Sequence, residues 1–330
     1  MAEVSRSGDV IIRARGLSKT YGKGSKAKTA VQGVDLDIRR GDIYVLIGLS
    51  GSGKSTVLRM LNHLIAPTTG TVEMDGQNLA ELSPRQLRDV RNRRLSMVFQ
   101  HFALFPHRTV RENAAYGLLL RGQSKAEAWA KADETLGIVG LSGWGDARPE
   151  ELSGGMKQRV GLARALTTDA DVILMDEPFS ALDPLIRTDM QALLVTLARE
   201  LGRTVVVVTH DLNEATQLGT QITLLAQGRV AQTGRAVDIL TRPADDYVRR
   251  FISDVDRSKV LTAADVLIPV GTWTGPVPEV LVGPDHTLAQ IAGRLGRSRG
   301  ATVTERGSVL GYVSTESVLS AVASYEGEAA

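Results

Sequence analysis

The sequence predicts an α/β protein whose core is a parallel sheet covered by helices on both faces. Apolar runs at residues 172–177 and 204–210 carry apolar side chains on both faces, which is typical of strands inside such a sheet. Strands alternate with segments of helical apolar spacing from about residue 40 to residue 210. A third apolar run, at residues 43–48, ends at a glycine and is followed by more glycines and a helical pattern. A smaller α/β unit is expected after this core.

The expected elements follow one another in a regular order. Residues 10–48 alternate apolar and polar positions before the run IYVLIG, which indicates strands. Residues 70–79 predict a strand, a turn and a second strand. The helix expected at 83–94 has a serine at its N-cap and a proline in its first turn. The remaining expected elements are helices at 54–65, 124–140, 156–168 and 183–201, and a hairpin at 221–234.

The sequence changes character after the hairpin. An Asp- and Arg-rich helix is expected after Pro243, at 244–257, and it closes a first domain over residues 1–257. Residues 258–284 are predicted to be a linker, because most of them lie in a stretch rich in Gly and Pro. A small unit over 285–330 then has the order helix, strand, turn, strand, helix.

Composition and charge narrow the class of protein. The 330 residues suffice for about two domains, at ~100–200 residues each. The chain has 39 Lys and Arg against 37 Asp and Glu, a net charge of +2, so nucleic acid is not expected as a partner. The lack of cysteine excludes disulfides, thiolate metal sites and a cysteine nucleophile. Neither a signal peptide nor a membrane span is predicted, so a cytosolic chain is expected, held at a membrane only through partners.

The segment GLSGSGKST at residues 48–56 carries the most specific chemical signal. It fits the pattern G-x-x-x-x-G-K-[ST] between a predicted strand and a predicted helix. Its glycines let backbone N–H groups converge on phosphates at a helix N-terminus, which is partially positive. Lys54 is predicted to reach the β- and γ-phosphates, and Ser55 is predicted to bind Mg²⁺. The flanking strand and helix make the alternative, a glycine-rich turn with a surface lysine, less favourable.

The strand end VILMDE supplies the second Mg²⁺ ligand that a phosphate-binding loop needs. Asp176 closes an apolar strand at the phosphate side of the sheet, and it is the predicted ligand. Glu177 follows it and is predicted to polarise the attacking water. The alternative is a buried strand that ends in two solvated acids.

The segment LSGGMKQR at residues 152–159 adds a family signature. Ser153, Gly154 and Gly155 precede a predicted helix and indicate a second anion-binding helix N-terminus, although an ordinary N-cap is the alternative. With LSGG between the phosphate-binding loop and the Asp-Glu strand end, the chain resembles the ABC (ATP-binding cassette) superfamily over about residues 10–255. The resemblance implies a P-loop NTPase cassette with a parallel-sheet core, an antiparallel β subdomain and a helical subdomain at about 100–168.

The resemblance assigns roles to further residues. Gln100 in MVFQ looks like the Q-loop glutamine, which would bind Mg²⁺ together with Ser55 and Asp176. His210 looks like the switch histidine, and it would form the catalytic group with Glu177 and Gln100. Taken alone, each of these residues is as readily structural. The implied ATP-binding residues are Tyr21, Gly48, Ser50, Gly51, Ser52, Gly53, Lys54, Ser55, Thr56, Ser153, Gly154, Gly155 and Asp183.

The resemblance also implies a mechanism and partners. Two cassettes would dimerise head to tail, with ATP between the phosphate-binding loop of one and the LSGG loop of the other. One chain holds only one of each, so a second ABC subunit is expected, most simply a copy of this chain, with ATP and Mg²⁺ as cofactors. The dimer would drive an integral membrane permease from the cytoplasmic face of the inner membrane, and an external substrate-binding protein would act indirectly.

Longer segments resemble one branch of the family. ELSGGMKQRVGLARAL and SALDPLIRTDMQ are most similar to bacterial importer ATPases for glycine betaine and proline. Importers of polyamines, sulfate, sugars or iron share the FALFPH segment and stay open as alternatives. Two further alternatives are a soluble ABC ATPase of DNA repair or translation and a regulatory module that binds nucleotide with little hydrolysis.

Two surface segments have competing interpretations. HFALFPHRTV at residues 101–110 is either core or, as the resemblance implies, a groove for a coupling helix of the permease, with Phe102 and Leu104 as apolar contacts. Five arginines in the helix at 83–94 are expected to form a solvated face. They are Arg85, Arg88, Arg91, Arg93 and Arg94.

The C-terminal unit resembles a single CBS motif in the segment TERGSVLGYVSTESVLSAV. Osmoprotectant importer ATPases often carry CBS motifs after the cassette, usually in tandem, and only one copy is recognisable here. The unit is therefore expected to be a partial CBS-like regulatory or dimerisation unit. Its arginines either face an anionic nucleotide or lipid or form a solvated basic loop; they are Arg294, Arg297, Arg299 and Arg306.

Overall fold

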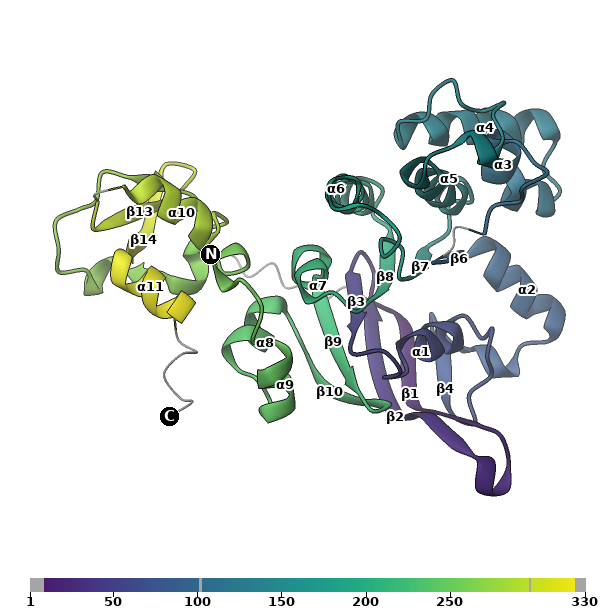
Figure 1. Cartoon of the computed structure of the whole chain (residues 1–330), viewed down its shortest axis with the longest axis horizontal. Helices are drawn as coiled ribbons and strands as arrows, with labels where there is room; N and C mark the ends of the chain where they lie inside the picture. The colour runs from purple at the N-terminus through teal and green to yellow at the C-terminus, as the bar shows by residue number, and fades with distance from the viewer. Residues whose placement is uncertain (1–8, 101–102, 297, 324–330) are drawn as a thin grey trace. The chain divides into compact units, whose positions relative to one another are not determined.

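The computed structural model describes residues 9–100, 103–296 and 298–323. It divides into two compact units (Figure 1). The boundary lies between Thr233 and Gly234. The sequence placed this boundary at residue 257 instead. The difference arises because Val237, in the helix α8 Ala236–Thr241, packs against the core of the second unit.

The first unit is built on the predicted parallel sheet. Its strand order is β10-β9-β3-β8-β7-β6, and the five strands from β9 to β6 pair with one another in parallel. Every residue of β3, β7 and β8 is buried, as expected for strands covered on both faces. The strands are β3 Ile43–Ile47, β6 Leu95–Val98, β7 Val172–Asp176, β8 Thr204–Thr209, β9 Gln221–Ala226 and β10 Arg229–Gly234.

A second sheet of antiparallel strands packs on the other side of α1 Lys54–Leu61, so this helix touches both sheets. Its order is β2-β1-β4-β5. Leu58 and Leu61 of α1 are fully buried in a core that includes residues of both sheets. The strands are β1 Val10–Tyr21, β2 Lys28–Arg39, β4 Thr69–Met74 and β5 Gln77–Asn78, and the short 3-10 helices beside them are η1 Gly24–Lys26 and η2 Leu79–Glu81.

Helices complete the first unit. A capping box starts α2 Pro84–Arg93, because Ser83 and Gln86 each bond the other's backbone N–H. The helical subdomain contains α3, which the sequence analysis did not separate, although Thr109 and Glu112 form a capping box at its start. The bounds are α3 Val110–Leu120, α4 Lys125–Ile138, η3 Pro149–Glu151, α5 Gly154–Thr167, α6 Pro184–Glu200 and α7 Leu212–Leu218.

The second unit is a four-stranded sheet with helices, in the order β11-β14-β13-β12. After β12 the chain runs α10, β13, β14, α11, which matches the order predicted for 285–330. The turn between β13 and β14 lies at Arg306 and Gly307, both with positive φ. The elements are α8 Ala236–Thr241, α9 Asp246–Phe251, η4 Arg257–Lys259, η5 Ala263–Val266, β11 Ile268–Pro269, η6 Val270–Thr272, β12 Leu281–Val282, α10 Leu288–Leu295, β13 Gly300–Glu305, β14 Ser308–Ser314 and α11 Thr315–Ala323.

Residues 258–284 are part of this second unit and not the linker that the Gly and Pro content predicted. Ile268 pairs with Tyr312, and Val282 pairs with Val303. Leu261 is buried in the core of the unit. Scattered apolar residues anchor the segment between its turns. In the ranges described above, no helix is both long enough and apolar enough to cross a membrane.

Candidate functional site

The loop between β3 and α1 follows a backbone path that requires glycine at two positions. Gly48 and Gly53 have φ of 153° and 99°. A Cβ added to Gly48 would lie 2.3 Å from the Leu225 carbonyl oxygen, and one added to Gly53 would lie 2.6 Å from the Ala30 carbonyl oxygen. The hydroxyl of Ser52 in this loop is buried and has no hydrogen-bond partner among the described residues. The loop thus runs tightly into the start of α1, whose first backbone amides have no partners within the helix.

Lys54 begins α1, and its side chain folds back over the loop. Its Nζ donates to the carbonyl oxygens of Gly48 at 2.7 Å and Leu49 at 3.0 Å. Burial lowers the pKa of Lys54, and the carboxylates of Glu177 and Asp176 oppose this shift. The ammonium group is therefore held at the mouth of the loop, close to two acids.

Ser55 and Asp176 bring a hydroxyl and a carboxylate together. Ser55 Oγ donates to Asp176 Oδ1 at 2.7 Å, and Asp176 is 5% exposed at the end of β7. Arg59, one turn further along α1, donates to Asp176 Oδ2 at 3.2 Å. Sequence analysis missed Arg59, although its position four residues after Ser55 places both on one face of the helix. Hydroxyl and carboxylate oxygens are the ligands that Mg²⁺ prefers, so the side chains of Ser55 and Asp176 fit a magnesium ion.

Glu177, His210 and Gln100 lie together at the ends of neighbouring strands. His210 Nδ1 is 3.2 Å from Glu177 Oε2, and Gln100 Nε2 is 3.5 Å from the same oxygen. Gln100 Nε2 also donates to Ser180 Oγ at 3.4 Å. Glu177 has φ of 47°, a left-handed conformation that is uncommon for residues other than glycine. The parallel order β6-β7-β8 explains the meeting, because these strands end at the same sheet edge.

Ser153, Gly154 and Gly155 lie at the start of α5, in the helical subdomain. Ser153 Oγ accepts from the Met156 N–H at 3.3 Å and so caps the helix. A Cβ on Gly155 would lie 2.6 Å from Ile186 of α6, whereas one on Gly154 would meet nothing within 4 Å. Within the described residues, no hydrogen bond or ion pair joins these three residues to the loop at 48–53. The two predicted phosphate-binding segments are thus separate within one chain.

The remaining residues predicted to bind nucleotide either bond only within their own segment or are exposed at the surface. Asp183 caps α6, because its Oδ1 accepts from the Ile186 N–H at 3.1 Å. Tyr21 ends β1 with 43% of its surface exposed, and Lys19 Nζ lies 5.5 Å from its ring centre. Ser50 and Gly51 are exposed in the loop, and Thr56 is half-buried on α1.

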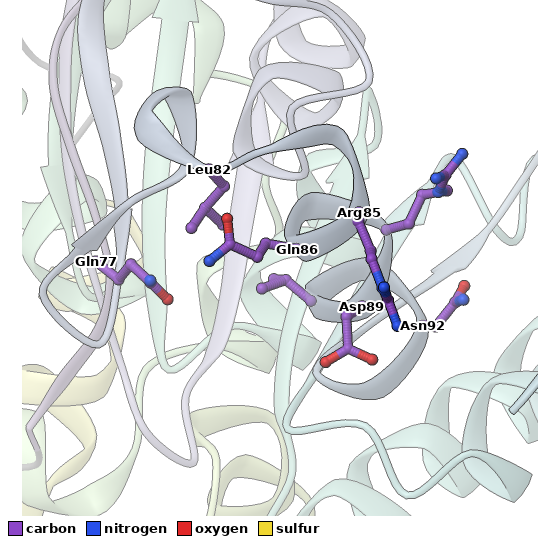
Figure 2. Close-up of a pocket in the computed structure, with 8 residues that line it drawn as sticks. Gln77, Leu82, Arg85, Gln86, Asp89 and Asn92 are labelled. Carbon is purple, nitrogen blue, oxygen red and sulfur yellow. The ribbon is translucent and has the colours of Figure 1, made fainter.

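The five arginines at residues 85–94 divide into two groups, and Arg93 is exposed like Arg85 and Arg88. Arg85 and Arg88 are exposed, as predicted, and line a hollow of about 620 Å³ on this helix (Figure 2). Arg91 instead donates to the carbonyl oxygens of Asn62 and His63, and Arg94 pairs with Asp75 and Asp171. The expectation of a solvated face was therefore wrong for Arg91 and Arg94, which the sequence could not show because their partners lie on other elements.

Sequence analysis also missed Glu214, on α7. Its Oε2 accepts from the hydroxyl of Thr209 at 3.0 Å, and the residue is 6% exposed. Burial raises the pKa of Glu214 to about 7, and the carboxylates of Asp211 and Glu177 act in the same direction. The sequence signal was its place in the first turn of a helix capped by Asp211, three residues earlier.

The raised pKa predicts a dependence of stability on pH. The pKa of Glu214 is about 7 in the folded chain against an ordinary value of 4.5, so the folded state binds the proton more tightly. Below about pH 4.5, Glu214 therefore makes its full contribution to the free energy of unfolding. As the pH rises through 7 this contribution is lost, and the free energy of unfolding falls by on the order of 3 kcal/mol. Glu214→Gln should remove this loss, as urea unfolding across the pH range would measure. If the unfolding free energies of wild type and Glu214→Gln differed by the same amount at about pH 5 and at about pH 8, the prediction would be contradicted.

Comparisons with known proteins agree with this geometry. The family model described as "ABC transporter" matches residues 31–180. The glycine betaine transport ATP-binding protein OpuAA of Bacillus subtilis is 52% identical over 245 residues, which are 74% of this chain and 59% of that protein. The glycine betaine/proline betaine transport system ATP-binding protein ProV of Salmonella typhimurium is 46% identical over 299 residues, 90% of this chain and 74% of that protein.

A solved structure supports the same family. A dimeric ATP-binding cassette in a post-hydrolysis state, bound to ADP and Pi, matches with a TM-score of 0.63 and 36% identity over 68% of this chain and 98% of that chain. The chain spans about three fifths of OpuAA, with 59% of its length covered. The predicted cassette fold and the family resemblance are confirmed, and the CBS-like unit stays a prediction. The chain belongs to the ABC transporter family and contains its ATP-binding domain.

Proposed function

We propose that this chain is the ATP-hydrolysing subunit of an importer for compatible solutes of the glycine betaine and proline type. The observation that carries the proposal is the convergence of Lys54, the Ser55–Asp176 pair and Glu177 at one edge of the parallel sheet. The solute class rests on OpuAA and ProV, whose names describe glycine betaine transport. ATPases of polyamine, sulfate or sugar importers are the alternative, and a soluble ABC ATPase outside transport is a more distant one.

ATP and Mg²⁺ fit the loop and its neighbours. The amides of residues 48–56 and the ammonium of Lys54 would hold the phosphates. Ser55, Asp176 and Gln100 offer the oxygen ligands for Mg²⁺, which when bound neutralises charge on the transferring phosphoryl group. The unpartnered hydroxyl of Ser52 is consistent with a polar ligand in this loop.

Glu177 is the proposed general base. Its carboxylate is 22% exposed, enough to meet a water molecule, and His210 lies within hydrogen-bonding reach of it. Gln100 contacts the same carboxylate, so movement of the Q-loop changes the surroundings of the base. Phosphoryl transfer to water depends chiefly on positioning and charge stabilisation and needs no covalent intermediate. Glu177 would orient and deprotonate the water, and His210 and Gln100 would hold the groups around it in position.

A second subunit completes the site in this proposal. Ser153, Gly154 and Gly155 form a helix N-terminus with free space at Gly154, away from the loop at 48–53 of the same chain. Two copies arranged head to tail would place this helix end against the phosphates bound by the other copy. Tyr21 would stack on the adenine, and Asp183 would lie at the dimer contact. A homodimer is the simplest arrangement.

The proposed partners lie at the membrane. The dimer would sit at the cytoplasmic face and drive a permease that receives solute from an external binding protein. Leu104 is half-buried beside Phe105, whose ring packs on Tyr116 at 4.6 Å, so the segment is fixed against α3 and still reachable. Phe102, the other apolar residue singled out in the sequence, lies outside the described residues. Residues 285–330, at the end of the second unit, are proposed to be a partial CBS-like regulatory or dimerisation unit.

Replacement of the proposed base tests the chemistry. Glu177→Gln keeps the shape of the side chain but removes its basicity, so ATP binding and the dimer should persist while hydrolysis falls about 100-fold or more. Steady-state phosphate release and ATP-dependent dimerisation measure this. Glu200→Gln, an exposed acid at the end of α6, is the matched control and should hydrolyse ATP normally. Near-normal turnover in Glu177→Gln would contradict the assignment.

Transport in proteoliposomes tests the solute class. Proteoliposomes that contain the chain and its co-purified permease should accumulate glycine betaine or proline when ATP is present. The Glu177→Gln variant should abolish this uptake. Choline, a polyamine, sulfate and maltose complete the panel. Uptake of one of these instead would keep the transport ATPase and discard the solute class, and the lack of both permease and uptake would favour the soluble ATPase.

A charge at Leu104 tests the permease groove. Leu104→Glu should weaken co-purification of the permease and leave basal ATP hydrolysis of the isolated chain within about twofold, because burying an unpaired carboxylate in the interface is unfavourable. Leu120→Glu, at an exposed apolar position on α3, is the control and should bind the permease normally. Loss of cooperative unfolding in Leu104→Glu would show that the segment is core instead.

A further inference from the structure

A small polar cavity lies directly behind the proposed base. It has a volume of about 40 Å³, and residues from the ends of β7 and β8 and from α6 and α7 line it. They are Glu177, Ser180, Arg187, Thr209, His210, Asp211 and Glu214. The cavity therefore joins the segment after Glu177 to the segment around His210, the two segments on which hydrolysis depends in the proposed function.

Two atoms of the lining residues lack partners. Among the described residues, neither Glu214 Oε1 nor Arg187 Nε has a hydrogen bond, and both atoms are buried. One is an acceptor when ionised and the other is a donor, so a single water molecule bound between them would satisfy both. The volume exceeds the ~10–15 Å³ that a buried water needs, and buried polar groups in native proteins are nearly always partnered.

The other contacts of these residues hold the backbone beside the proposed base. Glu214 Oε2 accepts from the Thr209 hydroxyl, which itself accepts from the Asp211 N–H at 3.0 Å. Thr209 immediately precedes His210. Arg187 donates to the Leu182 carbonyl oxygen at 3.2 Å and lies 3.6 Å from an Asp211 carboxylate oxygen. The same two side chains thus contact the segments on both sides of the cavity.

We propose that Glu214 and Arg187 are positioning residues, which hold His210 and Glu177 in place through the hydroxyl of Thr209 and through one water bound between Glu214 and Arg187. The inference rests on ATP hydrolysis as the proposed function. The charged groups that face Glu214 are Arg187 and Asp211 with Glu177 beyond them. The role is one of geometry, because among the described residues the hydrogen bonds and ion pairs of the Glu214 and Arg187 side chains go to Thr209, Leu182 and Asp211, and not to residues proposed to bind nucleotide.

Substitutions at Thr209 test the positioning role. Thr209→Val keeps the volume but loses the donor to Glu214, and we expect kcat for ATP to fall about tenfold or more with KM within about twofold, since a small misplacement of catalytic groups lowers the rate steeply. Thr209→Ser keeps the hydroxyl and should restore most of kcat. Thr223→Val is the matched control, because Thr223 is a fully buried strand threonine whose hydroxyl bonds Tyr44 and Thr233.

The kinetic outcomes separate the two proposals. If the wild type hydrolyses ATP and Thr209→Val has the same kcat, the positioning role is overturned and the proposed ATPase function stands. If the wild-type chain does not hydrolyse ATP, the proposed ATPase function is overturned, and the positioning role of Glu214 and Arg187 in catalysis is overturned with it. Unfolding of each variant by urea shows whether it is folded. If Thr209→Val fails to fold, the following measurement decides.

A double-mutant cycle tests the water without any catalysis. Glu214→Gln keeps an acceptor but removes the charge, and Arg187→Lys keeps the charge but removes the Nε donor. If one water joins the two side chains, the unfolding free energies of the single variants should not add in the double variant, measured at about pH 8 where Glu214 is ionised. Additive energies overturn the bridge. A crystal structure with an ordered water between the two atoms supports it directly.

Discussion

A hydrogen bond of 2.7 Å between Ser55 and Asp176 joins two elements whose residues are 121 positions apart in the chain. It forms because β3 and β7 both pair in parallel with β8, so α1 starts close to the place where β7 ends. The same arrangement puts Glu177 and His210 side by side, and β6 adds Gln100 on the far side of β7. Each proposed chemical role is thus a consequence of strand order. A sheet with another order would scatter the same side chains.

The backbone near this hydrogen bond is strained or tightly packed at several points. Gly48 and Gly53 pass so close to neighbouring carbonyl oxygens that no side chain fits, and Glu177 has a left-handed conformation. A non-glycine residue in such a conformation costs of order 1–3 kcal/mol and persists only where its surroundings enforce it. Here the buried strands on both sides enforce it, and the Glu177 N–H bonds the Val208 carbonyl oxygen at 3.0 Å. The stable core therefore holds the proposed catalytic groups in positions that a flexible loop would not keep.

The two proposed phosphate-binding segments differ in how they are built. The loop at 48–53 is closed around its own contacts, while the start of α5 leaves free space at Gly154. This asymmetry is what a site shared between two copies requires, because one half must grip the phosphates and the other must approach from outside. The cavity beside Glu177 is lined by residues of α6, which packs against Gly155, and by the strand end that carries His210. It therefore lies between the two elements.

The sequence by itself determined the segments and their chemistry. Alternating and continuous apolar runs predicted the strands, and Ser83 marked the start of a helix as its cap. The glycine-rich loop, Asp176 and Glu177 were recognisable because each signal spans a few neighbouring residues. The tertiary structure alone decided which side chains meet. It turned residues 258–284 from an expected linker into part of a folded unit, paired Arg94 with distant aspartates, and buried Glu214 opposite Arg187. These outcomes depend on burial and on contacts between distant segments, which local sequence patterns do not encode.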